Sequence, residues 1–319
     1  MKLIKTITLS LLILCTLCAC QNNTQIKDLS IPLLKISYDS GECSLYEWNV
    51  EKEEIISKEK TLFINKEDPF SLLYTYWNGK DKFILYDDNT HIINSDNSVT
   101  VSFRENRRES YFQDYILLKM DDNSFILKTE KESYNIPLES TIVINGEEFF
   151  VKELALSAFY VKENKAYILL NNYSTEENCI KLYILEVDYN SGISELYEVE
   201  NCPNTLSPSL PPAGNNVMPL NNSFYVFNYT QIFKIDVDSK TSKEILNIAE
   251  LKKENYFKSQ NKKDYVITRI GQYNNYIIIN VVGDWQLSAE ENYICLLELD
   301  SGNIINLIKA HYEYIVPNL

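Results

Sequence analysis

The heptapeptide LYILEVD at residues 182–188 is one of four similar segments in a chain of 319 residues. Each copy follows one seven-position pattern: an apolar residue, an aromatic or apolar residue, any residue, an apolar residue, a polar residue, Val or Leu, and an acidic residue. Aromatic and β-branched residues of this kind are typical of strands. The other three copies are LYEWNVE at 45–51, IFKIDVD at 232–238 and ICLLELD at 294–300. A turn and a second apolar run follow each copy, so each predicts a strand, a turn and a second strand.

A further strand is expected before most of these hairpins, which makes repeated units. The expected strands begin near residues 33, 83, 125, 167, 224 and 276, so the units are 42–57 residues long. Units of this length with three or four strands match the blades of a β-propeller. The strand–turn–strand endings resemble those of blades in bacterial extracytoplasmic propellers. We therefore expect an all-β, β-propeller-like domain of about six blades at residues 31–319. The alternative is a β-sandwich or two small β domains.

Residues 203–219 interrupt this pattern because they contain five prolines. Proline cannot donate a backbone hydrogen bond and is not expected in a central strand. We expect a long loop here, which serves either as a spacer or as part of a binding face.

The start of the chain reads as a leader. Two lysines precede an apolar run at residues 7–17, about half the length that a membrane-spanning helix needs. The sequence LCAC, which ends at Cys20, resembles the lipobox of bacterial lipoproteins. This resemblance implies a signal peptide at residues 1–19, a lipid on Cys20 and a tether at residues 20–30. It also implies a cell-membrane location that faces the extracytoplasmic side. A secretory signal cut elsewhere and a signal anchor are the alternatives.

The charge of the chain limits the partners that it can bind. Lys and Arg number 30 and Asp and Glu number 45, which gives a net charge of −15. Without the two lysines of the leader the balance is 28 − 45 = −17. A body this acidic argues against nucleic-acid binding, which needs clustered cations. The expected partners are the membrane, through the lipid, and an envelope protein or a glycan.

Four cysteines of the body are candidates for disulfides. Cys179 and Cys202 are equidistant from the turn at residues 190–191, so a symmetric hairpin places them opposite each other. Cys43 and Cys295 lie on equivalent strands of the first and last units, which are neighbours in a closed ring. An extracytoplasmic location permits both bonds. The alternative for both pairs is buried thiols that pack as small apolar groups.

No motif in the sequence indicates a catalytic or cofactor site. The two histidines, His91 and His311, have no ligand neighbours at a spacing that is typical of zinc sites. We expect no metal and no cofactor, and whether the protein has an activity stays open. Trp48, Trp77 and Trp285, with Tyr74, Tyr76 and Tyr111, form either a sugar-binding surface or part of the core.

The favoured function is a lipid-anchored extracytoplasmic scaffold that binds a protein or another ligand without catalysis. The alternative is a carbohydrate-active enzyme with paired carboxylates in the channel of the propeller.

Overall fold

The computed structural model describes the greater part of the expected β domain. The ranges described are 29–37, 40, 42–64, 72–77, 82–86, 89–93, 98–103, 109–112, 115–119, 124–129, 131–137, 142–144, 147–149, 154–174, 179–202, 217–249, 265–283, 292–299, 301–310 and 314–315. In the second blade, the description is largely limited to the backbone.

Six antiparallel sheets of four strands form the described part of the fold, and we number them as blades in chain order. From the innermost strand outward, blade 1 is β26 (Tyr314–Ile315), β1 (Ser30–Ser37), β2 (Glu42–Asn49) and β3 (Glu54–Ile64), and blade 2 is β4 (Leu72–Trp77), β5 (Lys82–Tyr86), β6 (Asn89–Ile93) and β7 (Val99–Phe103). In the same order, blade 3 is β8 (Glu109–Phe112), β9 (Tyr115–Lys119), β10 (Ser124–Lys128) and β11 (Ser133–Pro137), and blade 4 is β14 (Ala155–Lys162), β15 (Lys165–Ser174), β16 (Cys179–Asp188) and β17 (Ile193–Glu198). Blade 5 is β18 (Val217–Leu220), β19 (Ser223–Phe227), β20 (Gln231–Asp236) and β21 (Ser242–Asn247), and blade 6 is β22 (Val266–Tyr273), β23 (Tyr276–Val282), β24 (Asn292–Glu298) and β25 (Ile304–Lys309).

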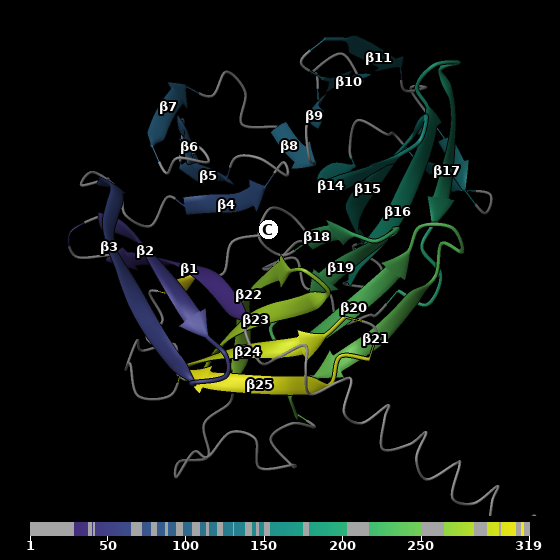
Figure 1. The fold of residues 1–319 in the computed structure, drawn as a ribbon. Helices are drawn as coiled ribbons and strands as arrows, with labels where there is room; N and C mark the ends of the chain where they lie inside the picture. The colour runs from purple at the N-terminus through teal and green to yellow at the C-terminus, as the bar shows by residue number, and fades with distance from the viewer. Residues whose placement is uncertain are drawn as a thin grey trace, which may run out of the picture.

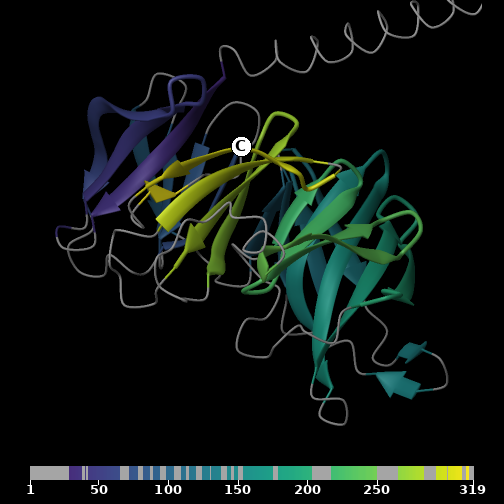
Figure 2. The same cartoon turned by 90° about the horizontal axis from the view of Figure 1, so that it is seen from below.

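The six blades surround a common axis, with strands such as β4, β14, β18 and β22 nearest to it (Figure 1). A two-stranded hairpin of β12 (Ile142–Ile144) and β13 (Glu147–Phe149) is inserted between blades 3 and 4. Figure 2 shows the ring from below, with the purple blade 1 beside the yellow-green blade 6. The fold is a β-propeller, and its six described blades confirm the predicted fold class.

The repeated heptapeptides form the third strands of blades 1, 4, 5 and 6. The predicted unit starts fall mostly on second strands, because β1, β5, β15, β19 and β23 begin near the expected positions. In blade 3 the predicted start near residue 125 falls on the third strand, β10, and the second strand, β9, comes earlier. The sequence therefore located the blades but missed their innermost strands.

The core consists of apolar layers between neighbouring blades. Described clusters lie between blades 3 and 4, 4 and 5, 5 and 6, and 6 and 1. A second or third strand is covered on both faces, so β19 is buried at every position. Such strands read as continuous apolar runs instead of alternating ones. The sequence therefore shows them as runs such as YIII at the start of β23.

The ring closes through β26, which pairs antiparallel with β1 as the innermost strand of blade 1. The pairs are Leu34 with Ile315 and Lys35 with Tyr314. Pro32, two residues before Leu34 on β1, has no backbone N–H to donate. Closure thus joins the last described strand of the chain to the first.

One expectation about the proline-rich segment is corrected by the structure. Residues 203–216 lie outside the described residues, but Pro219 belongs to β18. β18 is the innermost strand of blade 5 and therefore an edge strand, which tolerates proline because one side of its backbone is unpaired.

Candidate functional site

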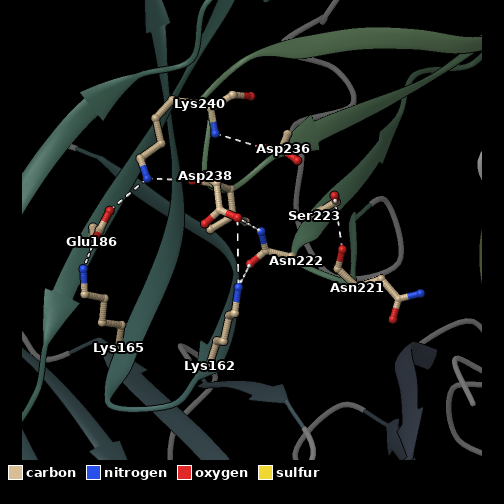
Figure 3. A network of polar contacts seen from close by, with 11 residues as sticks. Lys162, Lys165, Glu186, Asn221, Asn222, Ser223, Asp236, Asp238 and Lys240 are labelled. Atoms are coloured by element: carbon tan, nitrogen blue, oxygen red, sulfur yellow. Dashed lines mark hydrogen bonds and ion pairs between the residues drawn. The ribbon is translucent and has the colours of Figure 1, made fainter.

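The two ends of the propeller differ in the connections that they carry. Turns between first and second strands, and between third and fourth strands, lie at one end, which we call the turn face. Those that the structure describes include residues 163–164, 189–192, 221–222, 237–241, 299 and 301–303. The opposite end of the propeller, which we call the loop face, carries the connections between second and third strands and those from one blade to the next. The best-described polar site is on the turn face, where blades 4 and 5 meet (Figure 3).

Local sequence shapes the turns that build this site. The Asp188 carboxylate accepts hydrogen bonds from the backbone N–H groups of Asn190 and Ser191. Asp236 in blade 5 accepts one from the N–H of Ser239 at 2.7 Å. Aspartate favours such turns because its short side chain reaches the backbone two or three residues on. The predicted hairpin turns after the heptapeptides of blades 4 and 5 are therefore confirmed.

Lys240 occupies an unusual backbone position in its turn. Its φ is +58°, whereas the corresponding turns of blades 4 and 6 place Gly192 (φ +74°) and Gly302 (φ +70°) in this conformation. A residue with a Cβ atom costs about 1–2 kcal/mol there relative to its ordinary conformation. The interactions of the Lys240 side chain offset that cost.

Glu186 of β16 lies between two lysines. Its Oε2 is 2.8 Å from Nζ of Lys240, which comes from blade 5, and its Oε1 is 2.5 Å from Nζ of Lys165. The Lys240 and Glu186 side chains are only 14% and 18% exposed, so solvent screens this contact less than an ordinary surface pair. The Lys240 ammonium also lies 4.9 Å and 5.3 Å from the ring centres of Tyr197 and Tyr167. Lys240 thus fixes blade 5 against blade 4.

The titration behaviour of Glu186 follows from these contacts. Burial raises the pKa of its carboxyl group, but the hydrogen bonds from Lys165 and Lys240 outweigh burial and lower the pKa below 4.5. Hydrogen bonds from backbone N–H groups, that of Ser191 first, likewise lower the pKa of Asp188. Both carboxylates are therefore ionised at neutral pH.

Backbone contacts and a second ion pair extend the same junction. The N–H of Glu200 donates to the carbonyl of Lys240 at 2.9 Å, and the N–H of Ser242 donates to the carbonyl of Glu200 at 2.8 Å. Farther along the turn face, Lys162 lies 4.0 Å from the Asp238 carboxylate, which also accepts a hydrogen bond from the Asn222 amide (Figure 3). This arrangement holds two blades together, and the carboxylates of Glu186 and Asp238 are each paired with lysine.

The sequence did not single out Glu186 or Lys240 as site residues. The signal that could have identified them is the lysine at a turn position that the copies of blades 4 and 6 fill with glycine. A strained residue there indicates that its side chain is needed.

The predicted cysteine pairs have different outcomes. Strands β16 and β17 pair in the expected register, with Tyr183 opposite Glu198, and this register continues toward Cys202. Cys202 nevertheless carries a thiol, whose Sγ donates to the carbonyl of Ile180 at 3.9 Å, so the Cys179–Cys202 bond is not present in the structure. The side chain of Cys179 lies outside the described residues.

The predicted bond between Cys43 and Cys295 is wrong. Both are buried free thiols. Cys295 packs in the layer between blades 5 and 6, whereas Trp48, an odd number of residues from Cys43 on β2, packs in the layer between blades 6 and 1. Because side chains alternate along a strand, Cys43 faces away from blade 6. Burial raises the pKa of the Cys43 thiol to about 12, as expected for a packing residue.

The remaining candidates are placed as follows. Trp48 is fully buried, so it belongs to the core and not to a sugar-binding surface. The other five aromatic candidates have side chains outside the described residues, as does the lipidation candidate Cys20. Within the described ranges there is no cluster of three metal-ligating side chains and no helix that could cross a membrane.

Comparisons with known proteins show similarity to solved structures alone. No protein-family model and no curated protein matches the chain. A putative TolB from Agrobacterium tumefaciens matches 87% of this chain and 87% of its own, with 10% identity and a TM-score of 0.44. The N-terminal domain of Nup159 matches 90% of this chain and 92% of its own, with 12% identity and a TM-score of 0.39. The tricorn protease matches 86% of this chain but only 25% of its own, with 10% identity and a TM-score of 0.34. Resemblance at this level carries no information about function.

Proposed function

We propose that the protein is a lipid-anchored, extracytoplasmic β-propeller that binds a protein or a glycan without catalysis. The observation that carries the binding role is the closed ring, in which β26, which follows blade 6 in the chain, pairs with β1 of blade 1. A closed ring holds the connections of all blades in fixed relative positions, and a preorganised surface loses less entropy when it binds. The lipobox-like LCAC ending at Cys20 supports the anchor.

The described carboxylates favour binding over acid–base catalysis. A glycosidase needs one carboxyl group that stays protonated near neutral pH, which requires a raised pKa. Among the described residues, each carboxyl group with a resolved shift has a lowered pKa, namely Glu47, Glu186, Asp188 and Asp236. Each has a hydrogen-bond partner that stabilises its charge.

The anchor is tested by labelling cells that express the full chain with a radioactive or clickable fatty acid. We expect incorporation into the wild-type protein and into the Cys18→Ala variant, and none into Cys20→Ala. Cys18 is a matched control because it is a cysteine two residues from the proposed site. Labelling of Cys20→Ala would contradict the proposed anchor.

The binding role is tested by crosslinking the tagged full chain in cells and identifying what is captured. We expect a reproducible partner with the wild type and a loss of that partner with Cys20→Ala, since an unanchored protein leaves the membrane surface. Turnover of a cell-envelope glycan by the purified protein would instead favour the carbohydrate-active alternative.

A further inference from the structure

Two asparagines of blade 6 have buried amide atoms without hydrogen-bond partners. Asn280 is only 6% exposed to solvent, and Asn292 is only 3% exposed. Oδ1 of Asn280, and both Oδ1 and Nδ2 of Asn292, have no partner. Buried polar atoms in folded proteins are nearly always bonded to protein or to ordered water. These three atoms therefore point to a bound molecule.

The two amides are neighbours on one face of the blade. In the register of β23 and β24, Asn280 is opposite Ile294 and Val282 is opposite Asn292. The asparagines thus occupy diagonal positions on the same face, where residues are roughly 7–8 Å apart or less. Ile294 packs in the layer between blades 6 and 1, so this face meets blade 1. A small molecule that both donates and accepts hydrogen bonds fits between the amides.

At the equivalent position of blade 4, the asparagine amide finds a hydrogen-bond partner within its own blade. Asn171 and Asn280 each lie opposite the first residue of a heptapeptide, Leu182 and Ile294. Nδ2 of Asn171 donates to the Ser157 hydroxyl at 2.7 Å, inside its own blade. Nδ2 of Asn280 instead crosses to the carbonyl of Tyr314 on β26 at 2.8 Å. The Asn280 amide therefore forms part of the ring closure.

We propose that a water molecule binds between Asn280 and Asn292 and bridges their amides at the closing junction. The water accepts from Nδ2 of Asn292 and donates to Oδ1 of Asn280, whose Nδ2 holds Tyr314. Water is the fitting ligand because the amide atoms are inaccessible from outside, and the donor of one amide and the acceptor of the other give a buried water two polar partners. The site links β23, β24 and β26.

Thermal unfolding of full-length variants tests this assignment. Leucine has nearly the shape of asparagine, so Asn292→Leu removes a polar group without opening a cavity. If the amide binds water, Asn292→Leu lowers the midpoint by about 2–4 °C. If the amide is dry, the same change removes an unsatisfied group and raises the midpoint or leaves it unchanged, which overturns the proposal. The exposed Asn303 is a matched control, and Asn303→Leu is expected to leave the midpoint unchanged.

A double variant and a crystal structure separate the water from other causes. Because both amides share one water, the midpoint of Asn280→Leu/Asn292→Leu falls less than the sum of the two single changes. Additive losses would overturn the shared site. A crystal structure of the wild-type protein does not depend on any variant folding. It should show a density peak within hydrogen-bond distance of both amides, and its absence would overturn the proposal.

Discussion

Two junctions of the propeller, between blades 4 and 5 and between blades 6 and 1, are held by different chemistry. The first uses charge, with Glu186 bonded to Lys240 across the junction. The second uses neutral amides, because Asn280 donates to the carbonyl of Tyr314 and Asn306 donates to the carbonyl of Val50 at 3.2 Å. Both junctions also bury an apolar layer.

The two junctions also differ in how far apart the joined segments are in the chain. Lys240 and Glu186 are separated by 54 residues, whereas Asn306 and Val50 are separated by 256. Closing the longer loop costs about 1.4 kcal/mol more in chain entropy, since each doubling adds about 0.6 kcal/mol. That cost is the size of one good hydrogen bond. The large buried Trp48 in the closing layer more than offsets it.

The largest effect is expected from Trp48→Ala in the closing layer, with Phe224→Ala in the layer between blades 4 and 5 as its match. Both residues are fully buried. Each change should lower the free energy of unfolding by about 3–5 kcal/mol in chemical denaturation. Hydrogen exchange distinguishes them, because Trp48→Ala should speed exchange in β1 and β24 and Phe224→Ala in β16 and β20. Equal exchange profiles would show that the junctions do not open separately.

A third junction, between blades 5 and 6, sharpens the comparison through Gly302. A Cβ atom on Gly302 would lie 2.1 Å from the carbonyl oxygen of Ile245 in blade 5, whereas one on Gly192 meets nothing within 4 Å. Both glycines have positive φ. Gly302→Ala should therefore cost about 2–4 kcal/mol from backbone strain and the clash. Gly192→Ala should cost only the strain, about 1–2 kcal/mol. Equal losses in urea unfolding would contradict the close contact between blades 5 and 6.

The charged junction gives a smaller effect than the loss of Trp48 or Phe224, and it gives a pH dependence. Glu186→Gln leaves Lys240 without its carboxylate and should cost about 1.5–3 kcal/mol at pH 7, as measured by urea unfolding. Because the folded pKa of Glu186 lies below 4.5, its contribution is present above that pH. The contribution is lost as the pH falls through the folded value. The difference between wild type and variant should shrink below pH 4.5, and a constant difference would contradict the role of the charge.

The class of fold could be read from the sequence because blades repeat. The heptapeptides keep their apolar and acidic positions, and the turn residues that follow them are set by local conformational preference, as with Gly192 and Gly302. The leader and Cys20 are equally local features, so the sequence by itself carries the expectation of a lipid anchor. Strands buried on both faces, such as β19, could be found as continuous apolar runs, whereas the innermost strands of the blades were missed.

Tertiary structure alone decided how the blades meet. No local signal pairs Glu186 with Lys240 or Asn280 with Tyr314, since these contacts depend on the position of one blade against another. For the same reason, the sequence could not show that Cys43 and Cys295 face away from each other. Their equivalent positions in the repeat do not tell which face of a blade each residue occupies. Hydrogen bonds and ion pairs need atoms within a few ångströms of each other, and only the packed ring sets such distances.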